Sequence, residues 1–418
     1  MKFSEYVVLG RQELTLDPLG FLAPYTSLQD KFFKQFTVLS NQPACHGILA
    51  LIYQCLQDDG IAPGQKGFTF EFRRAEIFWG ILHALGTGSA SVLNIRKYHE
   101  LMRGRIDLSV DDIRKNERIY ASLSYGVLGH YSSPSTTWGI LSKSGKQLTE
   151  LGSELGEAFG KREGKSLRKA IDAWRKGCKW DVGQLQAMSK LFEAKAKPSV
   201  DEAKVWRRLI KEYCDRLPQS RTLWERPLSE KEFEDWEKTP ANYQDGFGKL
   251  QARYASLSAE LVLVQHFEQL IGLVQHIFER EYLSIAEQAN GPLPIAKLET
   301  QLVMQLGKVA AAYVQLPGHH DTKGLFQSLA KVGDYRDAAE LICAHHGAHQ
   351  KSKGNIPFIE DGHLRISKKF DFLAYEERCN ALKKAGDGKE TLAVIAHHYR
   401  RDWHFQRASL YHQYAHPA

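Results

Sequence analysis

A run of basic side chains at residues 161–180 is the part of this sequence that most directly suggests chemistry. It contains eight Lys or Arg residues and two acidic residues, so its net charge is +6, compared with +7 for the whole chain of 418 residues. Lys and Arg contact the phosphates of nucleic acids and supply most of the affinity that does not depend on base sequence. The run therefore indicates double-stranded DNA as the first partner to consider.

The basic run is predicted to form an amphipathic helix over residues 166–176. Lys165, Lys169 and Lys176 share one face of this helix. The opposite face is apolar and comprises Leu167, Ala170, Ile171 and Trp174. A solvated helix face is the ordinary interpretation of such a charge run, and an acidic protein partner would satisfy the same charges.

The candidate nucleic-acid contacts include the basic side chains of this run and two lysines from a polar turn that precedes it. They are Lys143, Lys146, Lys161, Arg162, Lys165, Arg168, Lys169, Arg175, Lys176 and Lys179. None of them belongs to a recognisable base-reading helix. Binding through these residues is therefore expected to be weakly sequence-specific and strongly dependent on salt.

Histidines of the C-terminal hundred residues form the second chemical candidate. His345, His346 and His349 lie close in sequence, and the four-residue spacing of the first and last places both on one helical face, as in some metal sites. Together with His319, His320 and Asp361 they define an alternative hypothesis, a metal-dependent nuclease. Ordinary surface or capping histidines would give the same pattern, and the sequence predicts no cofactor.

Residues 160–166 end in Gly-Lys-Ser before a helix, which resembles a phosphate-binding loop. Such a loop needs four residues between its glycines and a preceding buried strand. Here three residues separate Gly160 from Gly164, and a helix is predicted before them. We expect no nucleotide hydrolysis here. No other motif establishes an enzyme, so the sequence favours a non-catalytic protein.

The elements around the basic run have the order of a winged-helix domain. Helices are predicted over residues 72–85, 91–102 and 109–125, followed by a Gly/Ser/Pro/Thr loop over 126–137. A strand–turn–strand then places a polar tip at Ser142–Gly145, and a further helix is predicted from Thr149 to Phe159.

The junction Gly139-Ile-Leu…Leu148-Thr-Glu-Leu-Gly152 resembles the passage from wing to helix in bacterial winged-helix transcription factors. The resemblance implies a recognition helix in the major groove and a hairpin resting on the DNA backbone. The loop over 126–137 is longer than in such domains. With the helix Arg73-Arg74-Ala-Glu76, the chain is also similar to accessory proteins of bacterial anti-phage defence and mobile-element operons.

These resemblances imply a DNA-binding, non-catalytic subunit of a multi-protein bacterial assembly, with anti-phage defence as its setting. Other protein subunits are the second partner class that they imply. A protein–protein scaffold without DNA binding is the remaining alternative. A salt-dependent DNA-binding assay separates the first hypothesis from the scaffold, and metal analysis separates the nuclease from both.

Composition sets the remaining expectations. Hydrophobic residues make up 43% of the chain and charged residues 25%, which is typical of a globular protein. The six cysteines are scattered without a Cys-x-x-Cys pair, which favours reduced thiols and a cytoplasmic location. The apolar stretch 259–278 carries too many polar residues for a membrane span.

We therefore expect a mainly α protein of helical bundle domains, with a winged-helix-like β-hairpin and a small C-terminal α+β unit. The predicted parts are an N-terminal helical segment (1–64), a winged-helix-like domain with the basic helix (65–180), a helical middle domain (181–316) and a His-rich C-terminal α+β unit (317–418).

Overall fold

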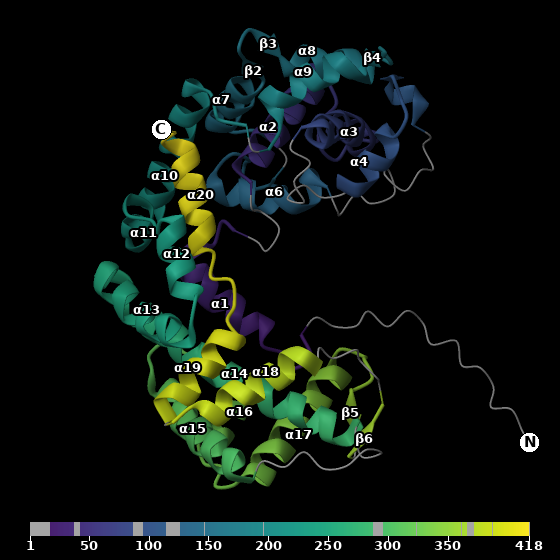
Figure 1. Cartoon of the computed structure of the whole chain (residues 1–418). Helices are drawn as coiled ribbons and strands as arrows, with labels where there is room; N and C mark the ends of the chain where they lie inside the picture. Colours follow the sequence, from purple (N-terminus) through teal and green to yellow (C-terminus); the bar gives the residue numbers. More distant parts are fainter. Residues whose placement is uncertain are drawn as a thin grey trace, which may run out of the picture. The chain divides into compact units, whose positions relative to one another are not determined.

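A computed structural model describes residues 17–36, 42–86, 95–113, 126–145, 147–194, 196–286, 296–322, 324–360, 362–365, 372–386 and 388–417. Within them the protein is mainly α-helical, as expected, and its strands form only two-stranded antiparallel sheets (Figure 1). The chain divides into two compact units. Unit 1 comprises residues 1–31 and 231–401, and unit 2 comprises residues 32–230 and 402–418. The predicted boundaries after residues 64, 180 and 316 do not coincide with this division.

Unit 1 is a helical bundle with one small hairpin. Helix α1 (Leu22–Phe33) crosses the boundary between the units near its end. The other elements of unit 1 are α12 (Glu230–Glu237), α13 (Pro240–Arg253), η4 (Ala255–Leu257), α14 (Ser258–Ala286), α15 (Ala296–Gln315), α16 (Leu325–Leu329), α17 (Tyr335–Ser352), β5 (Ile359–Glu360), β6 (His363–Leu364), α18 (Phe372–Lys384) and α19 (Gly388–His398). The paired strands β5 and β6 lie within the segment predicted as a C-terminal α+β unit.

Helix α14 lies at the centre of unit 1, packed by α13, α15, α17 and α19. It is long and apolar enough to cross a membrane by length and composition alone, but most of its apolar window is buried inside the protein. Some of its buried polar groups have partners there. The fully buried Glu268 accepts hydrogen bonds from the Tyr243 hydroxyl and, at 2.8 Å, from the Arg401 backbone N–H. These contacts are those of a core helix in a globular domain.

Unit 2 contains the basic run. Its elements are α2 (Pro43–Asp58), α3 (Phe68–Leu85), α4 (Ile95–Met102), β1 (Asp107–Leu108), η1 (Val110–Asp112), α6 (Val127–Trp138), α7 (Glu150–Phe159), β2 (Lys161–Arg162), β3 (Lys165–Ser166), α8 (Leu167–Arg175), β4 (Trp180–Asp181), α9 (Val182–Phe192), α10 (Val200–Arg216), η3 (Pro218–Ser220), α11 (Arg221–Glu225) and α20 (Phe405–Ala415). Helix α2 is almost completely buried and packs against α3, α6 and α7.

The prediction of a loop over residues 126–137 is wrong, because this segment forms helix α6. Val127, Tyr131 and Trp138 recur at helical spacing and are buried, so packing overrides the low helix propensity of a Gly/Ser/Pro/Thr sequence. The Glu76 carboxylate also accepts the Val127 backbone N–H at 2.6 Å, which satisfies one free donor at the start of the helix.

Helices α19 and α20 are separate, because the chain leaves the helical conformation between them. His404 has a left-handed backbone (φ 63°), which an α-helix does not tolerate. The Asp402 carboxylate accepts the His404 backbone N–H at 2.8 Å and so holds the break in place. The break allows α20 to belong to unit 2 while α19 belongs to unit 1.

His46, on the buried helix α2, generates a prediction about acid stability. Its ring bonds Ser135 Oγ at 2.6 Å through Nδ1 and the Tyr411 hydroxyl at 3.0 Å through Nε2. Burial lowers the pKa of His46 to about 3, so the ring is neutral in the folded protein and gains a proton on unfolding below pH 6.5. The free energy of unfolding of unit 2 should therefore fall as the pH drops below 6.5, by roughly 2 kcal/mol at pH 5 from this residue.

Denaturant unfolding at pH 7.5 and pH 5 measures this effect, and tryptophan fluorescence reports mainly on unit 2 because only Trp236 lies in unit 1. His46→Gln keeps a polar side chain but cannot titrate. We expect the variant to lose about 2 kcal/mol less than the parent between the two pH values. An equal loss in both proteins would show that His46 is not the responsible group.

Candidate nucleic-acid interface

Helix α8 has the apolar face that the sequence predicts. The Ser166 hydroxyl accepts the backbone N–H of Lys169 at 3.3 Å and so caps the first turn. The residues Leu167, Ala170, Ile171 and Trp174 are buried. The Trp174 indole donates to the Arg74 carbonyl oxygen at 2.9 Å, which fixes α8 on α3. One side of α8 is therefore fixed in the core, and the lysine face is turned outward.

The predicted contact residues fall into two groups in the structure. Carboxylates of unit 2, most of them distant in sequence, pair with half of them. Lys161 pairs with Glu157 at 2.7 Å, Arg168 pairs with Asp58, Arg175 pairs with Asp59 at 2.7 Å and with Glu71 at 3.2 Å, and Lys179 lies 3.8 Å from Asp107. The fifth paired residue, Arg162, is buried. Carboxylates within the fold thus compensate part of the positive charge of the segment.

The prediction that Arg162 contacts nucleic acid is wrong, because its side chain lies in the core of unit 2. Its guanidinium donates to the Glu202 carboxylate at 2.5 Å, to the Tyr414 hydroxyl at 3.1 Å and to the Leu191 carbonyl oxygen at 2.5 Å. Tyr414 also donates to Glu202, at 2.6 Å. Burial, and then the nearby Glu202 charge, raise the pKa of Tyr414 well above its usual value, so this hydroxyl keeps its proton. Arg162 therefore has a structural role.

Lys165, Lys169 and Lys176 are exposed, and within the described residues none of them has an ion-pair partner. Lys165 lies in β3 before α8, Lys169 lies in α8 and Lys176 caps its C-terminal end, and these three residues are called the lysine face of α8. Asp172 is on the same side and lies 3.9 Å from Arg175. These three lysines are the part of the basic run whose charge is available to an external partner.

The lysine face is preceded by a tight hairpin that sequence reasoning missed. Strands β2 and β3 pair Lys161 with Ser166 and Arg162 with Lys165. Glu163 and Gly164 form the turn, with positive φ values of 47° and 72°. Two adjacent residues with positive φ are typical of a two-residue hairpin turn, and only the glycine marks it in the sequence. The Gly-Lys-Ser segment is thus part of a hairpin and not a loop wrapped around a phosphate.

The second predicted hairpin is present in reduced form. Leu141 and Leu148 form an isolated antiparallel bridge, and Ser142 and Gly145 close the predicted turn with a backbone hydrogen bond of 2.7 Å. The helix predicted from Thr149 to Phe159 is α7, and the Thr149 hydroxyl caps it by accepting the Gly152 N–H. Lys143 is exposed in this turn, whereas Lys146 and most of the predicted helix over 109–125 lie outside the described residues. The winged-helix interpretation therefore stays a prediction.

The C-terminal histidines hold backbone segments of unit 1 together. His345 Nε2 donates to the Leu19 carbonyl oxygen at 2.9 Å. His346 donates through Nδ1 to the Pro18 carbonyl oxygen at 2.8 Å and accepts the Phe358 N–H through Nε2 at 2.8 Å. Both ring nitrogens of His346 are therefore engaged, and a metal would have to displace one of these bonds.

His349 is the third weak metal candidate, and its ring packs against Gly20. A Cβ added at Gly20 would lie 2.7 Å from the imidazole, and the positive φ of 75° also favours glycine there. His319 and His320 belong to a different segment, and Asp361 lies outside the described residues. Among the side chains that the structure describes, no three His, Cys, Asp or Glu residues are gathered so as to hold a metal ion.

Arg162 and its neighbour Lys161 provide a matched test of these assignments. Arg162→Met leaves Glu202 buried without its cation and should destabilise unit 2 by about 3–5 kcal/mol. Lys161→Met removes an exposed pair and should change stability by less than about 1 kcal/mol. Fluorescence-monitored denaturation measures both. Comparable small effects of the two substitutions would show that the buried pair does not stabilise the fold.

No protein-family model, curated protein or solved structure matches this chain. The role of α8 is therefore inferred from the charges, the exposure and the partners of its own residues.

Proposed function

We propose that the protein binds double-stranded DNA through the lysine face of α8, as a non-catalytic subunit of a multi-protein bacterial assembly in the cytoplasm. The observation that carries this proposal is the set of three exposed lysines, Lys165, Lys169 and Lys176, that lack carboxylate partners among the described residues. Lys169 projects from α8, whose opposite face is fixed in the core, while Lys165 lies in β3 directly before the helix and Lys176 is its C-terminal cap. Anti-phage defence is the setting that the sequence resemblance implies.

The geometry of α8 favours contacts to the DNA backbone over contacts to bases. Lysine ammonium groups at helical spacing present positive charge along a line, and they bind phosphate without a fixed angular requirement. The helix is also short, and its nearest arginines are engaged in pairs with Asp58 and Asp59. We therefore expect binding to be similar for different DNA sequences.

An acidic surface on a partner protein is the competing occupant of the same lysine face, because it would neutralise the same charges. The scaffold hypothesis predicts that an acidic protein surface occupies the lysine face and that the chain does not bind DNA. For the nuclease hypothesis, the hydrogen bonds of His345 and His346 to backbone groups speak against an available metal site. DNA binding by the isolated chain at low salt is the result that separates the proposal from the scaffold.

Two triple variants with the same change in net charge test the proposal. Replacing Lys165, Lys169 and Lys176 with Ala removes the unpaired charges without touching the apolar face of α8. The slope of log K against log salt should become shallower by up to about 3 units, because each phosphate contact contributes roughly 0.9. Fluorescence anisotropy with duplexes of unrelated sequence, measured between 50 and 200 mM salt, gives this slope.

The control variant replaces Lys161, Arg168 and Lys179 with Ala. These cations are exposed but paired with carboxylates. Its slope should change by less than about 1 unit, since these charges are already compensated. If both variants weaken binding equally, net charge and not the lysine face is responsible. If neither changes binding, α8 is not a DNA surface.

A further inference from the structure

Unit 2 contains a pocket of about 620 Å³ between α10, α11 and α20, away from the residues assigned to DNA binding. Its buried lining consists of Ile210, Cys214 and Trp224. Burial raises the pKa of the Cys214 thiol to about 11, so the thiol keeps its proton at neutral pH. The buried wall of the pocket is therefore uncharged and largely apolar.

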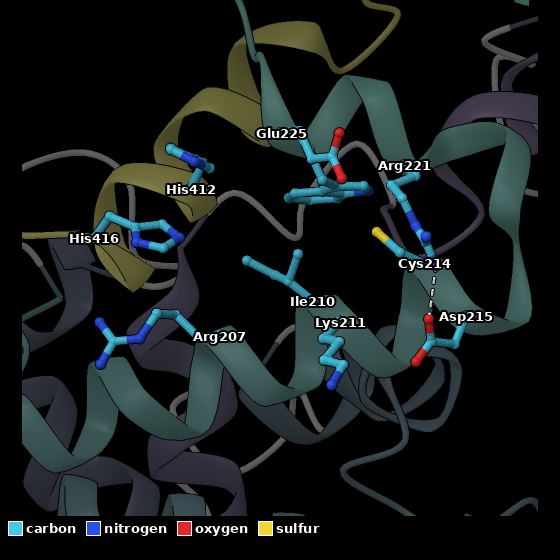
Figure 2. A pocket seen from close by; sticks show the side chains of 10 residues that line it. Arg207, Ile210, Lys211, Cys214, Asp215, Arg221, Glu225, His412 and His416 are labelled. Carbon is cyan, nitrogen blue, oxygen red and sulfur yellow. Dashed lines mark hydrogen bonds and ion pairs between the residues drawn. The ribbon is translucent and has the colours of Figure 1, made fainter. Parts of the chain in front are cut away.

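Arg207, His412 and His416 lie on one side of this pocket, and Lys211 lies on α10 between Arg207 and Asp215 (Figure 2). His412 is on α20, and His416 is the C-terminal cap of that helix. The two imidazole rings are in contact, with centroids 4.5 Å apart. The Arg207 guanidinium donates to the Ala415 carbonyl oxygen at 2.9 Å, which holds it at the pocket. Lys211 has no ion-pair partner among the described residues.

The other side of the pocket is closer to electrical balance. Arg221 donates to the Asp215 carboxylate at 2.8 Å, so these two charges compensate each other (Figure 2). Glu225 is the remaining carboxylate of the lining, and the labelled side chains place it apart from Arg207 and Lys211. The pocket thus has a basic side, a side whose charges compensate each other and an apolar wall.

The histidines are suited to donate hydrogen bonds without adding charge. Burial, and then the neighbouring His416, lower the pKa of His412. Burial, and then Arg207, lower the pKa of His416. Both rings are therefore neutral at pH 7, and each offers one N–H donor. Together with Arg207 and Lys211, the pocket lining presents two permanent positive charges and two neutral donors.

We propose that this pocket binds a small phosphate monoester that carries an apolar or aromatic body. A monoester phosphate has close to two negative charges at neutral pH and three strong acceptor oxygens, which match two cations and two neutral donors. A carboxylate offers one charge and two oxygens. The ester body would lie against Ile210 and Trp224. This binding activity is separate from the proposed binding of DNA by α8.

Titration of the full chain with phenyl phosphate tests the proposal, with calorimetry for affinity and NMR for the histidine ring protons. We expect saturable binding that shifts the signals of His412 and His416, assigned from His412→Gln and His416→Gln. Lys211→Met should weaken binding about tenfold. Lys204→Met, on the same helix but outside the pocket lining, should leave the affinity unchanged and controls for net charge.

Lys211 is exposed, so its replacement should leave folding intact, and thermal unfolding of the variant verifies this. Equal affinity of Lys211→Met and the parent would overturn the proposal, as would binding without a shift of either histidine signal. Benzoate or benzyl alcohol binding as tightly as phenyl phosphate would exclude the phosphate class. Displacement of phenyl phosphate by duplex DNA would show that the pocket is instead part of a nucleic-acid surface.

Discussion

The buried contact of Arg162 with Glu202 and Tyr414 is the constraint on which the organisation of unit 2 depends. It joins the hairpin before α8 to α10, 40 residues later, and to α20, 252 residues later. A buried guanidinium and a buried carboxylate are each costly alone, so the three segments are stable in this arrangement only together. The contact fixes the start of α8, which follows the hairpin directly. It also places α20 beside α10, where the two helices line the pocket.

The local features of α8 were predictable from the sequence because they depend on neighbours within one or two turns. Ser166 as the cap and the buried face around Trp174 follow from residue type and helical spacing alone. Helix α6 was not predictable in this way. Its residues are poor helix formers, and what stabilises it is the burial of Tyr131 and Trp138 and a carboxylate from α3.

The charge of the candidate site also depends on residues that are distant in the sequence and could not be predicted from local composition. In the sequence, residues 161–180 have almost no acidic compensation, whereas in the fold Asp58, Asp59 and Glu71 lie against Arg168 and Arg175. These carboxylates are about a hundred residues away in the chain, so no reading of local composition could pair them. The C-terminal histidines are a second case. Their spacing is compatible with a metal, but His345 and His346 bond the backbone of residues 18 and 19.

The most direct test of this account is the salt dependence of duplex binding by the unmodified chain, because it counts the phosphate contacts. The three residues of the lysine face alone predict a slope of log K against log salt of about −3. A slope near −9 would mean that all ten predicted cations contact DNA. That result would contradict the assignment of Arg162 to the core and of its neighbours to ion pairs within the fold.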